Sequence, residues 1–209
     1  MIKVAVVGGI GSGKSHVAKL FGYPVFDADK EVKKLYKKNK KCYYKLKKSL
    51  PNYITSFPIK KYELSKAILA NQINLRKITK IIHPAIRSRM NKFVKKNKTK
   101  KIIVLDIPLL LENKINNKKD ILIFVEAKRE EINKRLRKRN KMSYKMIKML
   151  KRFQLPVEVK KKKSDFIIKN NFKNNFVKKN VKNILKEILI NVWSNTWHRD
   201  NRTINNRAT

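Results

Sequence analysis

An α/β fold built on a parallel sheet is the fold class that this sequence predicts, and three observations support it. Short runs rich in valine, isoleucine and leucine are typical of buried parallel strands. Segments with apolar residues at helical spacing alternate with these runs. A glycine-rich stretch joins the first run to the first helical segment. Strands and helices that alternate in this way form a parallel sheet with helices on both faces and right-handed crossovers.

Five segments of the chain have the pattern of strands. The first covers residues 2–7 and ends at a glycine, and the second lies in the extended sequence PVFDAD, which starts at Pro24. The others, at residues 101–108, 120–127 and 166–168, are flanked by polar or turn-forming residues. These five segments supply the strands of the predicted sheet.

Helical periodicity fills most of the remaining chain. Residues 14–21 follow the glycine-rich stretch, and Gly22 ends their pattern. A region of amphipathic helices with basic faces comes next, and we expect residues 30–97 to form a helical insertion. Its helical stretches are residues 32–50, 62–82 and 84–94, with a connection at 51–58. Later helices are predicted at residues 130–139, 144–153 and 176–193.

Length and composition bound the class of protein. With 209 residues, of which 42% are hydrophobic, the chain can form one main core and a small inserted subdomain. Its single cysteine, Cys42, excludes an internal disulfide framework, and the N-terminus lacks a charged and apolar leader. No apolar run approaches the ~18 residues of a membrane-spanning helix. We therefore expect a cytoplasmic protein with no membrane partner and with a disordered tail at residues 194–209.

The net charge of +41 raises the question of a nucleic-acid partner. The lysines are spread from Lys3 to Lys186, and the chain is also rich in asparagine and isoleucine, whose codons are AT-rich. Solvated lysine faces on a protein of AT-biased composition account for this pattern. We therefore expect no specific nucleic-acid partner, although non-specific binding is compatible with the charge, and the positive field favours small anionic substrates.

Residues 8–15, GGIGSGKS, form the most specific motif. They fit GxxxxGK[ST], with Gly8, Gly13, Lys14 and Ser15 at the fixed positions, between a predicted strand and a predicted helix. Glycines let backbone N–H groups approach a phosphate, and the helix that begins at Lys14 points its positive end at the same place. Lys14 is expected to reach the β and γ phosphates, and the Ser15 hydroxyl to ligate Mg²⁺. The motif predicts a nucleotide site, which GTPases, motor ATPases and small-molecule kinases share.

Two carboxylates follow the second predicted strand. Asp27 and Asp29 lie at its carboxyl end, the edge at which open parallel sheets bind ligands, and they face the same side if the strand continues through both. A carboxylate there can orient an attacking hydroxyl or accept its proton. The alternative is that one of them caps the helix that begins near Lys30.

Four further side chains are candidates for the site. Asp106 ends a predicted buried strand and could hold the water shell of magnesium, or cap the turn before Pro108. His83 could contact a substrate or be a packed, hydrogen-bonded histidine. Arg135 and Arg139 share one helix face and could bind nucleotide phosphates, or face solvent like most basic residues of the chain.

Taken in order, these motifs resemble the dephospho-coenzyme A kinases. The phosphate motif, DAD at residues 27–29, HPAI from His83 and DIPLLLEN from Asp106 all occur in the order typical of that family. The arginines Arg135 and Arg139, then Gln154, and finally SDFIIKNN with Asp165 complete the series. The resemblance spans residues 7–171, and the succession is far more specific than the phosphate motif alone.

The resemblance implies a P-loop NTPase three-layer fold with a five-stranded parallel sheet, a helical substrate-binding insertion and a lid. It implies a nucleotide-binding core at residues 1–29 and 98–193, a lid near 130–160, and a domain for dephospho-coenzyme A at 30–97. The implied reaction transfers the ATP γ-phosphate to the ribose 3′-hydroxyl of dephospho-coenzyme A, with Mg²⁺ as cofactor.

The resemblance also assigns roles to residues. The implied catalytic residues are Lys14, Arg139 and Asp29, the last as base. The implied ATP-binding residues are Gly11, Ser12, Gly13, Lys14, Ser15, His16, Arg135 and Asn170. The implied acceptor-binding residues are Asp27, Asp29, His83 and Asp106.

Several positions depart from the family pattern. Val7 and His16 replace threonines next to the phosphate motif, Asn140 replaces an aspartate in the lid, and Ser164 replaces an alanine. Residues 39–62 match poorly, so no substrate contact is predicted there. Two other hypotheses stay open: another P-loop small-molecule kinase, such as a nucleoside-monophosphate kinase, and a basic nucleic-acid-binding protein without catalysis.

Overall fold

The computed structural model describes residues 1–113, 115–138 and 144–193. Within this part, the chain divides into two compact units. Unit 1 comprises residues 1–25, 100–138 and 154–193, and unit 2 comprises residues 26–99 and 144–153. Arg139 and the predicted tail at 194–209 lie outside the described residues.

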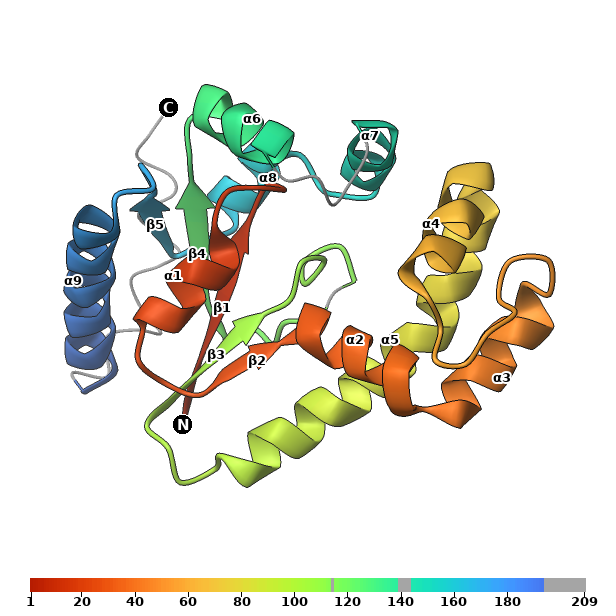
Figure 1. Cartoon of the computed structure of the whole chain (residues 1–209). Helices are drawn as coiled ribbons and strands as arrows, with labels where there is room; N and C mark the ends of the chain where they lie inside the picture. The colour runs from red at the N-terminus through yellow and green to blue at the C-terminus, as the bar shows by residue number, and fades with distance from the viewer. Residues whose placement is uncertain (114, 139–143, 194–209) are drawn as a thin grey trace. The chain divides into compact units, whose positions relative to one another are not determined.

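The chain forms a five-stranded parallel sheet, four of whose strands make up the centre of unit 1 (Figure 1). The remaining strand, β2, begins at Val25, the last residue of the first segment of unit 1. The strand order is β2-β3-β1-β4-β5, and β1 pairs in parallel with β3 and β4, as β4 does with β5. The strands are β1 Ile2–Gly8, β2 Val25–Asp27, β3 Ile102–Asp106, β4 Ile121–Glu126 and β5 Phe166–Lys169. The sheet confirms the α/β class that the sequence predicts.

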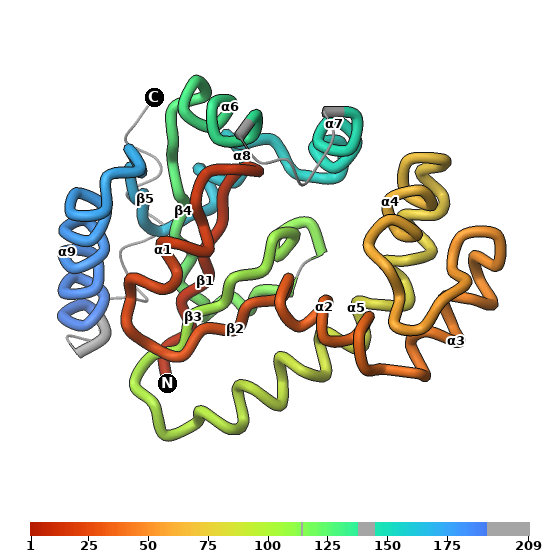
Figure 2. Tube along the Cα trace, in the orientation of Figure 1, coloured from red at the N-terminus to blue at the C-terminus, as the bar shows by residue number. Residues whose placement is uncertain are grey.

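The helices of unit 1 are α1 Lys14–Leu20, α6 Arg129–Lys138, α8 Val157–Lys162 and α9 Asn174–Trp193. Helices α1 and α9 lie next to each other (Figure 2) and bury Val17 and Val181 in one apolar core. Alternate residues of the strands, such as Val4, Val104 and Ile123, point into this core because successive strand residues face opposite sides. Nearly every residue of β1, β3 and β4 is buried, as the continuous apolar runs predict.

The strand register places the functional loop at one edge of the sheet. Val6 of β1 lies opposite Asp106 of β3, and Gly8 lies opposite Val125 of β4. The loop that leaves β1 therefore begins where the carboxyl ends of β3 and β4 meet. This is the edge at which open parallel sheets bind their ligands.

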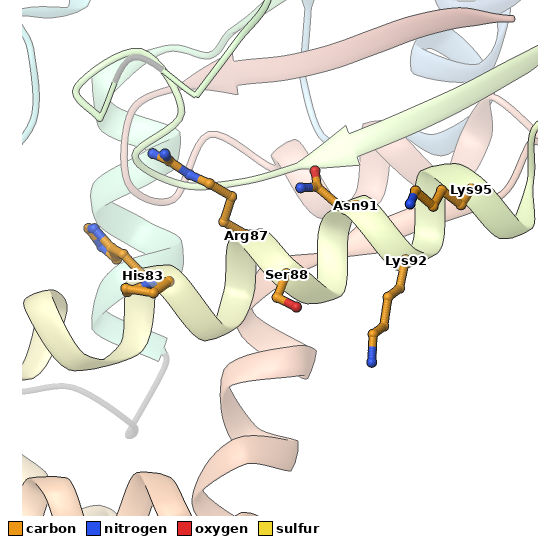
Figure 3. A pocket seen from close by; sticks show the side chains of 7 residues that line it. His83, Arg87, Ser88, Asn91, Lys92 and Lys95 are labelled. Carbon is orange, nitrogen blue, oxygen red and sulfur yellow. The ribbon is translucent and has the colours of Figure 1, made fainter.

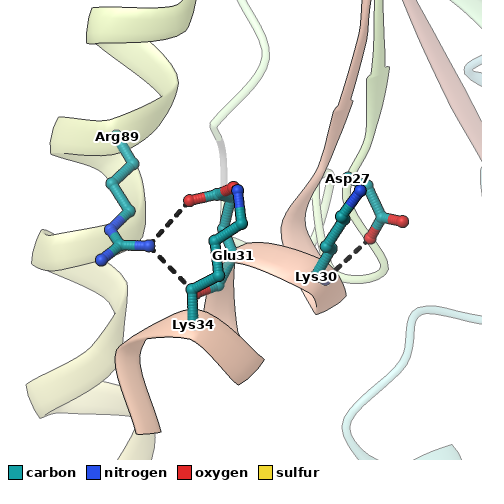
Figure 4. A network of polar contacts seen from close by, with 5 residues as sticks. All are labelled: Asp27, Lys30, Glu31, Lys34 and Arg89. Atoms are coloured by element: carbon teal, nitrogen blue, oxygen red, sulfur yellow. Dashed lines mark hydrogen bonds and ion pairs between the residues drawn. The ribbon is translucent and has the colours of Figure 1, made fainter. Parts of the chain in front are cut away.

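Unit 2 is helical. Its helices are α2 Ala28–Lys38, α3 Lys40–Ser49, α4 Lys61–Ala70, α5 Gln72–Lys96 and α7 Tyr144–Arg152. The buried carboxylate of Glu63 in α4 holds the connection before that helix, because it accepts hydrogen bonds from both the amides and the hydroxyls of Thr55 and Ser56. Arg89 of α5 pairs with Glu31 of α2 at 2.7 Å (Figure 4).

Three of the predicted helical stretches have other boundaries in the structure. The stretch 62–82 is divided between α4 and α5, because the Asn71 side chain accepts from the amide of Ile73 and caps α5. The stretch 32–50 forms two helices, because the Asn39 side chain accepts from the amide of Cys42 and caps α3. Pro84 does not begin a new helix, since α5 continues through it. Pro84 and Lys80, the residue four positions earlier, are both exposed, so water can hydrate the carbonyl that loses its amide partner.

Candidate active site

The loop between β1 and α1, residues 8–15, is called the phosphate loop here. Its glycines adopt backbone angles that other residues rarely adopt, with φ of 84° at Gly11 and 92° at Gly13. Space is also restricted, because a Cβ on Gly13 would lie 2.3 Å from the side-chain nitrogen of Asn170. Glycine at position 13 is therefore required both by the backbone angle and by its neighbour.

Asn170, which directly follows the edge strand β5, holds the phosphate loop by hydrogen bonds. Its side-chain nitrogen donates to the carbonyl of Ser12 at 2.7 Å, and its side-chain oxygen accepts from the amide of Phe172 at 2.9 Å. The Asn170 amide donates to the carbonyl of Glu126, and only 3% of the residue is exposed. The nitrogen and the oxygen of the Asn170 side chain therefore both make hydrogen bonds within the protein, and the bond to Ser12 fixes the path of the loop.

Lys14 begins α1 and returns its side chain to the loop. Its ammonium donates to the carbonyls of Gly9 at 2.7 Å and Gly8 at 3.2 Å. The amides at the start of a helix have no acceptors within that helix, and the helix dipole adds positive potential. A cation and main-chain donors therefore converge on one small region, which suits a phosphate group.

The neighbours of Lys14 differ in exposure. Ser15 and His16 are exposed on the first turn of α1, so the Ser15 hydroxyl is accessible to a ligand. Ser12 is buried, and its hydroxyl has no hydrogen-bond partner within the described chain. A Cβ on Gly8 would lie 2.8 Å from this hydroxyl, so Ser12 fills the space that Gly8 leaves.

Arg135 of α6 stacks on an aromatic ring beside the loop. Its guanidinium carbon lies 4.4 Å from the centre of the Phe172 ring, and that ring lies 3.4 Å from a Cβ built on Gly13. The structure thus brings Arg135 and Asn170 to the phosphate loop within unit 1. Its predicted companion, Arg139, lies outside the described residues.

Asp106 is the last residue of β3 and is 4% exposed. Its register partner, Val6, stands two residues before the phosphate loop begins. The carboxylate therefore belongs to the same edge of the sheet as the loop.

The DAD sequence lies where a strand becomes a helix. The strand ends at Asp27, whose carboxylate caps α2 by accepting from the amide of Lys30 at 2.8 Å (Figure 4). Asp29 is exposed on the first turn of α2. The sequence predicted that Asp27 and Asp29 face the same side if the strand continued through both of them. The strand ends at Asp27, so this condition is not met. Asp27 is the residue that caps the helix.

His83 lies on α5 in unit 2, in a pocket whose lining includes several basic side chains (Figure 3). The pocket, called the α5 pocket here, has a volume of about 590 Å³, and its lining residues are His83, Pro84, Arg87, Ser88, Asn91, Lys92 and Lys95. His83, Arg87, Asn91 and Lys95 are four residues apart, so they form one strip along the helix. Such a strip favours an elongated anionic ligand.

Burial, with a smaller contribution from the nearby Arg87 cation, lowers the pKa of His83. His83 is therefore neutral at pH 7, and one ring nitrogen can donate while the other accepts. The charge of the α5 pocket comes from its arginine and lysines.

The sequence interpretation missed three features of unit 1. Phe172 provides the ring on which Arg135 stacks, 37 positions later in the chain. The short helix α8 was not predicted, and its Val157 lies next to Gly9 of the phosphate loop. Glu112 and Lys160 form a buried ion pair at 2.7 Å. No local spacing indicates contacts between such distant residues.

The parallel sheet, the GxxxxGK[ST] loop on its carboxyl edge and the helix that follows define a P-loop phosphotransferase. Residues 2–175 match the dephospho-CoA kinase family, and the chain belongs to that family. It is therefore an ATP-dependent phosphotransferase of coenzyme A biosynthesis.

Individual relatives agree with this assignment. A dephospho-CoA kinase of Wolbachia pipientis wMel is 37% identical over 170 residues, which cover 79% of this chain and 87% of that protein. A dephospho-CoA kinase of Zymomonas mobilis is 31% identical over 173 residues, covering 81% and 88%. A crystal structure from Thermus thermophilus superposes with a TM-score of 0.72 at 26% identity, over 89% of this chain and 97% of that one.

Two further solved structures share the fold. The dephospho-CoA kinase of Campylobacter jejuni has a TM-score of 0.61 at 24% identity, over 89% of this chain and 96% of that one. A shikimate kinase of Acinetobacter baumannii has a TM-score of 0.50 at 14% identity, over 91% and 94%. These confirm the P-loop kinase fold. Across the described residues, no helix combines the length and the apolar character needed to span a bilayer.

Proposed function

We propose that this chain transfers the γ-phosphate of ATP to the ribose 3′-hydroxyl of dephospho-coenzyme A. The observation that carries the proposal is the phosphate loop, in which Lys14 and the start of α1 converge beside a buried aspartate. Transfer of this kind asks the protein mainly to position the reactants and to neutralise charge.

On the donor side, the ATP phosphates would lie against residues 11–16. Lys14 would neutralise charge on the β and γ phosphates, and Arg135 and Arg139 would contact the nucleotide from the lid segment. Asn170 would act by fixing the loop, because its amide group already binds Ser12 and Phe172.

Magnesium fits the donor set at this site. Across the described chain, no three His, Cys, Asp or Glu side chains gather closely enough to form a metal cage. Mg²⁺ usually takes most of its ligands from phosphates and water, so the exposed Ser15 hydroxyl suffices as its ligand from the loop. When bound, the ion would neutralise phosphate charge.

On the acceptor side, residues 30–97 would bind dephospho-coenzyme A. The α5 pocket supports this proposal, because Arg87, Lys92 and Lys95 suit the diphosphate of the acceptor, and neutral His83 can donate to it or accept from it. Asp27 and Asp106 are proposed to contribute to acceptor binding through their places at the ends of β2 and β3.

Asp29 is the proposed base. Its exposed carboxylate on the first turn of α2 can accept the proton of an attacking hydroxyl. Asp29→Asn should lower kcat by about 10²-fold or more, with the Kd of ATP unchanged. A collapse of ATP affinity would instead assign Asp29 to the nucleotide site.

The test is an acceptor panel. The purified protein is mixed with ATP and Mg²⁺, and ADP release is followed with dephospho-coenzyme A, with AMP, CMP and UMP, and with no acceptor. The expected result is turnover with dephospho-coenzyme A well above all the other samples. Preference for a nucleoside monophosphate would replace the proposal with the alternative kinase. ADP release that does not depend on any acceptor would reject both.

A further inference from the structure

The buried ion pair between Glu112 and Lys160 lies outside the groups that contact substrate in the proposed reaction. Lys160 is 1% exposed, and its ammonium lies 2.7 Å from a carboxylate oxygen of Glu112. The ammonium also donates to the side-chain oxygen of Gln154 at 3.3 Å. Burial of two charges is costly, so this pair is weak evidence for stability and invites another explanation.

The same Glu112 oxygen makes a second contact. It accepts from the amide of Leu155 at 3.0 Å. Leu155 is the second residue after the chain returns from the α7 segment of unit 2 to unit 1 at Gln154. Glu112 and Lys160 therefore hold the first residues of the returning chain by one main-chain and one side-chain hydrogen bond.

The held segment leads directly to the phosphate loop. Pro156 precedes α8, and the Val157 side chain at the start of that helix lies 3.8 Å from a Cβ position on Gly9. The carbonyl of Gly9 is the one that accepts from the Lys14 ammonium at 2.7 Å. Within unit 1, a series of neighbouring residues thus runs from Glu112 through Leu155, Val157 and Gly9 to Lys14, with hydrogen bonds at its two ends.

From this series we infer that Glu112 and Lys160 are positioning residues for phosphoryl transfer. Glu112 fixes the Leu155 amide, α8 then supports Gly9, and Gly9 fixes the ammonium of Lys14. Lys160 is needed because it balances the buried charge of Glu112. This inference rests on the proposed function only in the acceptor used to measure kcat. The expected changes in ATP binding do not depend on which acceptor the enzyme uses.

Two double variants separate positioning from packing. Glu112→Gln with Lys160→Met removes both charges but keeps a side-chain oxygen for the Leu155 amide. Glu112→Leu with Lys160→Met removes the charges and the acceptor as well. Replacement of a buried ion pair by apolar groups of similar size often leaves stability unchanged, so both proteins should fold.

Kinetics then decide the question. The Gln variant should keep kcat within about threefold of wild type. In the Leu variant, kcat should be about tenfold lower than in wild type, and the KM for ATP should be several-fold higher. The KM for the acceptor should be unchanged. Equal kinetics in the two variants, at equal melting temperature, would overturn the inference, because a packing role predicts no difference between them.

Controls address folding and the reaction itself. Lys161 pairs with Glu126 at the surface, where the two side chains are 39% and 35% exposed, so Lys161→Met should leave every parameter unchanged. If the Leu variant fails to fold, the Gln variant alone decides, since a tenfold loss of kcat at wild-type melting temperature would overturn the inference. Binding of a fluorescent ATP analogue is measured for all variants, so the result stands even if the natural acceptor is not dephospho-coenzyme A.

Discussion

The phosphate loop of unit 1 and the α5 pocket of unit 2 both suit phosphate groups, but they are built differently. In the loop, glycine backbone angles, main-chain carbonyls and a buried asparagine set the geometry. In the pocket, exposed arginine and lysine side chains on one helix provide the charge. A site made of main chain tolerates almost no change of residue, whereas a site made of long side chains can be rearranged.

Lys14→Ala tests the charged side chain of the phosphate loop. We expect kcat to fall by about 10³-fold or more, because a cation that stabilises charge on the transferred phosphoryl group has effects of this size. The fold should persist, since the lysine is half-buried in a loop and adds little to packing. Circular dichroism and single-turnover kinetics measure both effects, with Lys19→Ala on the same helix as control. Turnover close to that of wild type would remove Lys14 from the mechanism.

Gly13→Ala tests the main-chain part of the comparison. The new Cβ would meet the Asn170 side chain at 2.3 Å, and the backbone angle of 92° is unfavourable for alanine. Strain of about 1–3 kcal/mol should weaken ATP binding by roughly 5- to 150-fold. Gly22→Ala is a matched control, because Gly22 also has a positive φ of 73° but no neighbour within 4 Å of its Cβ. Equal ATP affinity in the two variants would show that the Asn170 contact does not shape the loop.

Arg87→Ala tests the α5 pocket, the site whose charge comes from side chains. We expect the KM for the acceptor to rise about tenfold, from the loss of one charged hydrogen bond, while the KM for ATP stays the same. Arg76→Ala, also on α5 but absent from the pocket lining, should leave both values unchanged. If Arg87→Ala changes the KM for ATP instead, the α5 pocket serves the nucleotide.

Glu63→Gln should have the smallest kinetic effect and a measurable effect on stability. Burial raises the pKa of Glu63, but hydrogen bonds from Thr55, Lys60 and Ser56 outweigh it and lower this pKa to about 2. The stabilising contribution is therefore complete above about pH 4.5 and is lost as the pH falls towards 2, with a size on the order of 3 kcal/mol.

Urea unfolding at pH 7 and pH 3 measures this contribution. The variant should be less stable than wild type at pH 7, and the difference should shrink at pH 3. Glu130→Gln, at an exposed position, should match wild type at both values. A difference between Glu63→Gln and wild type that is constant with pH would contradict the assignment.

The sequence predicted the phosphate loop well because its information is local. Glycines at fixed spacing, a lysine and a serine specify a backbone path, and the apolar runs before and after them specify a strand and a helix. The positions of Gly13 and Lys14 could therefore be inferred without any contact from elsewhere.

The other features depend on residues far apart in the chain. Asp27 ends its strand because its carboxylate caps α2, which the alternation pattern alone could not decide. Pro84 fits the usual signal for a helix start, yet α5 continues through it at an exposed position. Glu112 and Lys160 stand 48 positions apart, so their ion pair follows from the fold and not from spacing.

The hydrogen bond from Asn170 to Ser12 also has a consequence for biosynthesis. It joins residues 158 positions apart, and the amide that makes it is among the last parts of the sheet to be translated. While the ribosome still holds β5, a nascent chain has its glycine motif but not the group that fixes the motif's shape. The nascent chain should therefore bind nucleotide with its full affinity only after β5 and Asn170 have left the ribosome.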